Sequence, residues 1–193
     1  VLFELIEGNT HDPVNGGYIE GCSRDCGALA DMRLSDKELY NSPKSMNTLL
    51  HILEAYTNLL RVWDDSRLHE QQKKLVEIFL NRIIDPSTNF NRLFFDLEWN
   101  PMGNQVSFGH DIECSWLLVD AAEVLADEHL LALSQQAALK IAAADHARGL
   151  DDDGSIFYEG GPIEITNPEK HWWAHAEGVV GFYNAYEICP PLD

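Results

Sequence analysis

A repeat of 63 positions constrains the fold of this chain more than any other feature. Three long stretches with helical spacing of apolar residues cover residues 45–63, 107–126 and 170–188. Near their starts lie Asn47, His110 and Trp173, each 63 positions from the next. Repeats of this length are typical of one supersecondary unit stacked on copies of itself. We therefore expect similar helical units in which these three residues occupy equivalent places.

The segments between the three stretches predict partner helices with one polar face. The first partner helix shows i, i+3, i+4 spacing at Leu75, Ile78, Phe79, Arg82 and Ile83. A second such helix is expected around residues 139–142. The three long stretches are instead apolar nearly all round, which indicates inner helices covered by outer ones in a layered toroid.

Turn-forming residues recur after the outer helices. Segments 12–18, 85–96 and 151–158 each carry Asp, Pro, Asn or Gly and then a short aromatic run. No long strand is predicted. The fold class is therefore all-α, built from helical hairpins with short β-turn excursions at one rim.

The number of helices indicates how much of a ring the chain can form. The sequence provides a helix remnant at residues 1–8, two full hairpins and a third inner helix. Six such hairpins would need nearly twice the 193 residues. We expect residues 1–193 to be a single domain that forms roughly half of a six-hairpin ring, as an internal segment of it. An open stack of fewer hairpins is the alternative.

The charge of the chain limits its partners. It has 32 acidic and 13 basic residues, a formal net charge of −19. Such a surface repels phosphate backbones and anionic headgroups, which argues against nucleic-acid and membrane partners. No stretch reaches the roughly 18 apolar residues that span a bilayer, and the first ten residues hold no basic group of a secretory signal. We expect a cytoplasmic protein, and its oligomeric state stays open.

The cysteines do not predict a disulfide framework or a metal site. The four cysteines are Cys22, Cys26, Cys114 and Cys189. They are too few and too scattered to form a disulfide framework in a chain of this length. Cys22 and Cys26 lack a second pair. We expect reduced thiols rather than a structural zinc.

His110 is the candidate for acid–base chemistry. It lies near the start of its helix, with Glu113 three residues later on the same face. A buried carboxylate beside an imidazole can orient it and favour its protonated form. Histidine can take and return a proton near neutral pH. The alternative is a core histidine whose polar partner is Glu113.

The equivalent places in the other two inner helices suit sugar binding. Asn47 and His51 share a face at i, i+4, and the asparagine amide can both donate to and accept from hydroxyl groups. Trp172 and Trp173 offer flat apolar faces for a pyranose. The alternatives are that Asn47 caps its helix, that His51 packs in the core and that the tryptophans are core residues. A metal site at His171, His175 and Glu177 is a further possibility, although we expect no metal.

If the hairpins stack in register, Asn47, His110 and Trp173 lie at one height around a common axis. A polar, a titratable and an aromatic side chain would then meet in one concavity. That combination suits a carbohydrate pocket. The expected partner is a small disaccharide or monosaccharide.

Three blocks of the sequence resemble those typical of cellobiose 2-epimerases. The blocks are Lys44–Thr48 with His51–Asn58, Phe108–Glu113 with Ser115–Leu118, and Lys170–Trp173 with Ala176–Phe182. They occur in the family's order and extend over nearly the whole chain. The resemblance implies the N-acylglucosamine 2-epimerase superfamily, an (α/α)6 barrel and no cofactor.

The resemblance also implies a mechanism. The reducing-end glucose of a β-1,4-linked disaccharide opens to its aldehyde, one histidine removes the C2 proton to give an enediolate, and a second histidine reprotonates the opposite face. His110 matches one catalytic histidine. Asn47, His51, Glu113 and Trp173 match residues that bind the sugar or stabilise the intermediate, and Trp172 binds the sugar or packs behind its neighbour.

Two parts of the family pattern have no counterpart in the 193 residues. They are a C-terminal block with the second catalytic histidine and an N-terminal region with a substrate-binding arginine. We therefore expect the intact parent protein to be the epimerase, and this chain alone to be weakly active or inactive.

Other functions are compatible with parts of the pattern. Sister activities are those of an N-acylglucosamine 2-epimerase and of a mannose or other aldose–ketose isomerase. A glycoside hydrolase would need two opposed carboxylates, whereas the best-placed titratable group here is a histidine. From another class, the segment could be a non-catalytic sugar-binding module or an inactive fragment.

Overall fold

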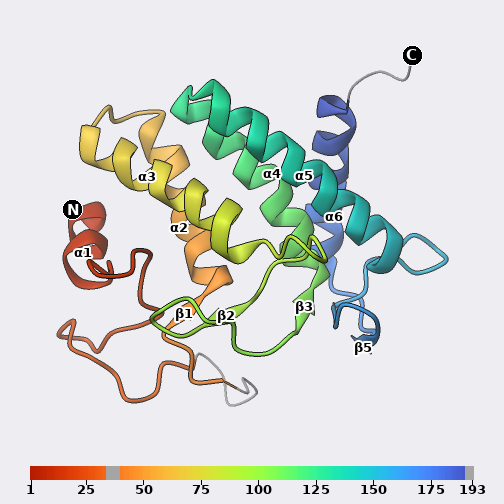
Figure 1. Ribbon diagram of the computed structural model, residues 1–193, viewed down its shortest axis with the longest axis horizontal. Coiled ribbons are helices and arrows are strands. Elements are labelled where there is room, and N and C mark those ends of the chain that lie inside the picture. Colours follow the sequence, from red (N-terminus) through yellow and green to blue (C-terminus); the bar gives the residue numbers. More distant parts are fainter. Residues whose placement is uncertain (34–39, 190–193) are drawn as a thin grey trace.

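The computed structural model describes residues 1–33 and 40–189 of the chain (Figure 1). Its helices are α1 (Leu2–Asn9), α2 (Met46–Leu60), α3 (Ser66–Ile78), the π-helical turn η1 (Phe79–Ile83), α4 (Phe108–Leu125), α5 (Glu128–Arg148) and α6 (Trp172–Ile188). Its strands are β1 (Lys44–Ser45), β2 (Phe94–Phe95), β3 (Val106–Ser107), β4 (Glu159–Gly160) and β5 (Ile165–Asn167). The three long helices expected from the sequence are present as α2, α4 and α6.

Side-chain caps explain where several helices begin. Ser45 precedes α2 and its hydroxyl accepts a hydrogen bond from the Thr48 N–H at 3.1 Å. Asp65 and Asp127 cap α3 and α5 in the same manner, each accepting from two backbone N–H groups. Such caps satisfy donors that have no partner inside the helix.

The helices form two layers. In Figure 1, α3 and α5 cover one side of the set formed by α2, α4 and α6. Helix α4 lies between its neighbours and is buried nearly all round, as expected of an inner helix. Helix α6 differs, because it packs through the small residues Ala174, Gly178 and Gly181. Its opposite face is exposed, including Val179 and Tyr186.

The outer helix of the first hairpin ends in a π turn rather than in regular α-helix. Phe79 and Ile83 are buried, but Arg82 is exposed. The two buried residues are four positions apart along this wider turn, so Arg82 does not share their face as its spacing predicted.

The three predicted turn segments share one structure. Each is closed by an isolated antiparallel bridge: His11 with Tyr18, Ile84 with Asn91, and Leu150 with Ile156. In each, an aspartate accepts a hydrogen bond from a backbone N–H one or two residues later: Asp12, Asp85 and Asp151. The prediction of a repeated turn plan is confirmed.

Short strands connect these turns to the inner helices. β1 pairs with β2, with Lys44 opposite Phe95, and β3 pairs with β4, with Ser107 opposite Glu159. β5 extends the second sheet beside β4. Because β1 and β3 lead directly into α2 and α4, their pairing fixes where these two helices start.

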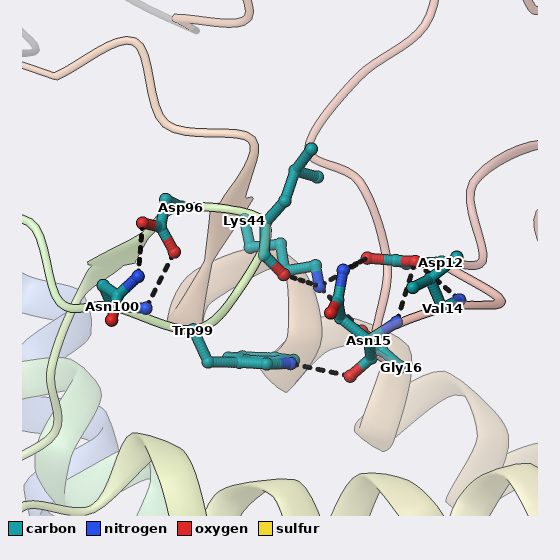
Figure 2. Close-up of polar contacts among 9 residues, drawn as sticks. Asp12, Val14, Asn15, Gly16, Lys44, Asp96, Trp99 and Asn100 are labelled. Atoms are coloured by element: carbon teal, nitrogen blue, oxygen red, sulfur yellow. Dashed lines mark hydrogen bonds and ion pairs between the residues drawn. The ribbon is translucent and has the colours of Figure 1, made fainter.

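A buried ion pair ties the first turn to β1 (Figure 2). The Lys44 side chain is fully buried, and its Nζ donates to Asp12 Oδ2 at 2.8 Å, to the Gly16 carbonyl at 2.9 Å and to the Leu97 carbonyl at 2.8 Å. The Trp99 ring lies 4.5 Å from the ammonium, and its Nε1 donates to the Asn15 carbonyl. One cation therefore joins three chain segments beside the start of α2.

Within residues 1–33 and 40–189, no helix is long and apolar enough to cross a membrane.

Candidate active site

A pocket of about 230 Å³ lies where α2 and α4 begin. Its lining residues come from strands, first helical turns and adjoining loops: Glu20, Ser45, Met46, Asn47, Leu93, Phe94, Ser107, His110, Tyr158 and Glu159. A larger cavity of about 430 Å³ lies between the first turn and α3, but none of the predicted site residues lines it. The smaller pocket is therefore the candidate active site, because Asn47 and His110 line it.

His110 lies in the first turn of α4 and is held by two contacts. Its Nδ1 is 2.6 Å from the Ser107 hydroxyl, and its ring centroid is 4.7 Å from that of Trp173. Burial lowers the pKa of His110 to about 4, with the nearby His51 adding to the effect. The imidazole is therefore neutral at pH 7 and able to accept a proton.

The expected pairing of His110 with Glu113 is wrong. The imidazole's hydrogen-bond partner is Ser107, and the pKa of His110 is lowered rather than raised, so the protonated form is disfavoured. Residues three apart on a helix share a face, but here the ring turns toward the serine that precedes the helix.

Trp173 and Trp172 have different positions. Trp173 packs against His110, so the structure brings this predicted pair together. Trp172 is 83% exposed and neither lines the pocket nor packs behind its neighbour. Successive residues on a helix point about 100° apart, so the two indoles cannot serve one site equally.

Gly109 allows Trp173 to approach α4. A Cβ at this position would lie 2.6 Å from the Trp173 ring and 2.8 Å from the Ala174 Cβ. The space beside His110 is thus occupied by an indole from α6. This close approach fixes the distance between the two helices.

Replacing Gly109 by alanine is therefore expected to displace Trp173 from His110. We expect the free energy of unfolding to fall by about 1–3 kcal/mol, as for other overpacked sites, with a changed tryptophan fluorescence. Urea titration followed by fluorescence measures both. Gly8→Ala is the matched control, because nothing lies within 4 Å of a Cβ there and helix α1 should gain up to about 1 kcal/mol. Equal behaviour of the two variants would contradict the close approach.

Asn47 contributes an unpartnered acceptor to the pocket. Its side-chain Oδ1 is buried and, in the described part of the chain, has no hydrogen-bond partner. Buried polar atoms are normally satisfied, and leaving one unpaired costs about 1–3 kcal/mol. A ligand hydroxyl or a bound water would supply the missing donor. Asn47 thus lines the same pocket as His110.

His51 and Glu113 lie beyond the pocket wall. His51 is one turn further along α2, about half exposed, with its Nδ1 3.3 Å from Glu54 Oε2. Glu113 is 8% exposed, and burial, followed by the carboxylates of Glu177 and Glu54, raises its pKa to about 7. Glu177 itself accepts a hydrogen bond from Trp116 Nε1 at 2.9 Å. The carboxyl group of Glu113 thus lies one turn after His110 on α4, outside the pocket lining.

Some residues at the site were not predicted from the sequence. Ser107, Trp116 and Glu177 contact or influence the predicted residues, and Tyr158 and Glu159 form a wall of the pocket. Trp116 lies within the second sequence block, and Glu177 within the third, so these two carried a signal. For Ser107 there was no sequence signal of a role at the site, apart from its position just before the helix.

The three residues of the possible metal site have separate partners. The His175 Nδ1 is 2.7 Å from the His171 carbonyl, and its Nε2 accepts from the Ile156 N–H. The His171 ring stacks on Tyr158 at 3.9 Å. Among the described residues, no group of three His, Cys, Asp or Glu side chains is arranged to hold a metal ion. All four cysteines are free thiols.

A pair of buried carboxyl groups lies behind His110. Asp111 and Asp145 are at most 1% exposed, and burial raises the pKa of both well above the ordinary value, with Asp111 adding to the effect on Asp145. Asp111 Oδ1 accepts from the Asn91 N–H at 2.7 Å. The other three carboxyl oxygens have no partner within the described residues. Burial without hydrogen-bond partners therefore favours the protonated form of these carboxyl groups.

The buried carboxyl groups of Asp111 and Asp145 should make the free energy of unfolding decrease as pH rises. A carboxyl whose folded pKa exceeds its unfolded value of about 3.9 stabilises the fold below that value, and the contribution is lost as pH rises through the folded pKa. Asp145→Asn removes one ionisation and supplies an amide donor. We expect this variant to be more stable than the parent at pH 8, by about 1–3 kcal/mol, and to depend less on pH.

Urea unfolding at pH 5, 6, 7 and 8 measures this effect. Asp152→Asn, on an exposed turn, is the control and should leave the pH dependence unchanged. An Asp145→Asn variant that is less stable than the parent across this range would contradict the account of the carboxyl pair.

Comparison with known proteins places the chain among sugar epimerases. The sequence model of the N-acylglucosamine 2-epimerase family matches residues 9–189. A cellobiose 2-epimerase from Bacteroides fragilis is 47% identical over 186 residues, which are 96% of this chain and 47% of that protein. One from Ruminococcus albus is 37% identical over 96% of this chain and 46% of its own length. The chain thus spans about half the length of these curated relatives.

Solved structures agree with the sequence comparison. A sugar epimerase from a ruminal bacterium superposes with a TM-score of 0.89 at 36% identity, over 97% of this chain and 47% of that one. The cellobiose 2-epimerase of Bacillus thermoamylovorans gives 0.87 at 35% identity, over 96% and 47%. A D-mannose isomerase gives 0.74 at 17% identity, which shows a common fold alone.

Proposed function

Because the chain belongs to the N-acylglucosamine 2-epimerase family, we propose that its parent protein epimerises C2 of the reducing-end glucose in β-1,4-linked disaccharides such as cellobiose. The names of the relatives that match most of this chain support the disaccharide. The observation that carries the chemistry is the neutral His110 in the pocket, with its pKa lowered by burial.

The proposed reaction is a proton transfer through an enediolate. The sugar ring opens to the aldehyde, which makes the C2 proton acidic. His110 takes this proton, and the electron pair delocalises onto the carbonyl oxygen. Return of a proton to the opposite face of C2 gives the mannose configuration, so atoms and charge balance over the cycle.

Asn47 in the pocket, and Trp173 and Glu113 outside its lining, have roles that fit this reaction. The free Oδ1 of Asn47 can accept a hydrogen bond from a sugar hydroxyl, and its amide N–H groups can donate to a developing enediolate oxygen. Trp173 packs on His110 and restricts the imidazole. Glu113, with a pKa near 7, is able to exchange a proton with a hydroxyl group further along α4.

The opposite face of C2 needs its own proton carrier. Among the described residues that line the pocket, His110 is the only histidine. We propose that a histidine of the parent protein supplies the second proton, and that this chain alone turns over slowly or not at all. The parent barrel, of which this chain would form about half, completes the proposed site.

Product identity separates the candidate activities. The chain would be tested alone and as a chimera in which it replaces the matching segment of the Bacteroides fragilis relative. Each would be incubated with cellobiose, N-acetylglucosamine and mannose, with products separated by chromatography. We expect glucosyl-mannose from cellobiose with the chimera. Conversion of N-acetylglucosamine or mannose alone would favour the sister activities, and release of glucose would overturn epimerisation.

A further inference from the structure

Two serines occupy equivalent places before the inner helices α2 and α4. Ser45 ends β1 and precedes α2, whereas Ser107 ends β3 and precedes α4. Both residues are nearly buried and both have extended backbone conformations. A serine in this position normally caps its helix by accepting a hydrogen bond from a backbone N–H two or three residues later.

Only one of these two serines acts as a cap. The Ser45 hydroxyl accepts from the Thr48 N–H at 3.1 Å, as the position predicts. The Ser107 side chain makes no capping bond to α4. Its hydroxyl lies instead 2.6 Å from Nδ1 of His110, which is the residue at the place of Thr48. The stabilisation that a cap would give α4 is thus exchanged for a contact with the imidazole.

The strand pairing holds Ser107 in this position. Ser107 lies opposite Glu159 in the antiparallel pair of β3 and β4, and its side chain is 4% exposed. The hydroxyl therefore has little freedom to move away from His110. Trp173 packs on the same imidazole, so the ring is restricted from two sides.

A hydroxyl group suits a histidine that must both take and return a proton. A neutral imidazole carries its proton on one of two nitrogens, and the partner of the first nitrogen decides which. A carboxylate partner would favour the charged ring, whereas a hydroxyl adds no charge. It can also accept from a protonated Nδ1 or donate to an unprotonated one. Nδ1 therefore has a partner at every stage of the reaction.

We propose that Ser107 is a positioning residue for His110, whose hydroxyl accepts the Nδ1 proton and leaves Nε2 as the nitrogen that exchanges protons with a ligand. The contact between His110 and Ser107 is made through Nδ1, which agrees with this assignment. The role in catalysis rests on the proposed function, but the tautomer of His110 is a property of the chain itself.

Nitrogen-15 NMR of the imidazole tests the tautomer without any turnover. In the parent chain at pH 7 we expect His110 with a protonated Nδ1 and an unprotonated Nε2. Ser107→Ala should produce a mixture of tautomers, and Ser107→Thr, which keeps the hydroxyl, should restore the parent spectrum. Asp65→Ala is the control, because it removes the side-chain cap of α3, outside the pocket, and should leave the His110 signals unchanged.

The outcomes separate positioning from a structural role. A protonated Nε2 in the parent, or an unchanged spectrum in Ser107→Ala, would overturn the proposal. Should Ser107→Ala fail to fold, the parent spectrum and that of Ser107→Thr still decide it. In the chimera, Ser107→Ala should lower kcat about 10- to 100-fold with little change in KM. A chimera without activity in any form would count against the proposed function and leave the tautomer result standing.

Discussion

Replacing His110 by asparagine is expected to lower kcat for cellobiose epimerisation by about 10²–10⁴-fold, the usual contribution of a general acid–base group. Asparagine is small enough for the pocket and can still bond to Ser107, so the fold should be retained. The measurement is kcat in the chimera, with circular dichroism to check folding.

His69→Asn is the control for this prediction. His69 is exposed on α3, outside the pocket, and its replacement should leave kcat within about twofold. If His110→Asn keeps most of the activity while His69→Asn does the same, His110 does not transfer the proton. Loss of activity together with loss of the circular dichroism signal would instead mean that His110 is needed for folding.

Replacing Lys44 by methionine is expected to lower the free energy of unfolding by about 3–5 kcal/mol, because it leaves the buried Asp12 carboxylate without its cation. Asp12 is 7% exposed and keeps only the hydrogen bonds of its own turn. Two carbonyl groups, of Gly16 and Leu97, also lose their donor. Urea unfolding at pH 7 measures the change.

Two further variants make this prediction specific to the buried pair. Lys74→Met breaks an exposed i, i+4 pair with Glu70 and should cost no more than about 0.5 kcal/mol. The double variant Lys44→Met with Asp12→Asn removes both charges and should recover a large part of the loss. A double variant as unstable as Lys44→Met alone would show that the ammonium stabilises the fold through the carbonyl groups rather than through Asp12.

The Lys44–Asp12 pair also has a defined pH dependence. Burial works against ionisation of Asp12, but the hydrogen bond from Lys44 and those of its turn hold the pKa of the carboxyl well below its usual range. A depressed folded pKa stabilises the fold above the unfolded value of about 3.9, and that contribution is lost as pH falls through the folded pKa. The pair thus persists until strongly acidic conditions.

The sequence predicted the repeated elements because each depends on local patterns. Helical periodicity located α2, α4 and α6, and turn residues located the bridged segments that begin at Asp12, Asp85 and Asp151. Asn47 and His110 line one pocket and Trp173 packs on His110, but α2, α4 and α6 begin at Met46, Phe108 and Trp172, so the three residues do not occupy strictly equivalent helix positions.

The partners of individual side chains could not be predicted in this way. Helical spacing places His110 and Glu113 on one face, but it does not show that the imidazole turns back to Ser107. The choice between Trp172 and Trp173 depends on the rotation of α6 about its axis, which Gly109 and Ala174 determine through close packing. The buried pair of Asp111 and Asp145 joins two helices whose contact has no signal in either segment alone.

Incubation of the chimera with cellobiose in deuterated water, followed by proton NMR of the product, tests the central claim most directly. The account predicts glucosyl-mannose with deuterium at C2, because a proton removed by His110 exchanges with solvent before a proton returns. It also predicts that His110→Asn removes this signal. Epimerised product that keeps its original hydrogen at C2 would contradict proton transfer through the enediolate and, with it, the role assigned to His110.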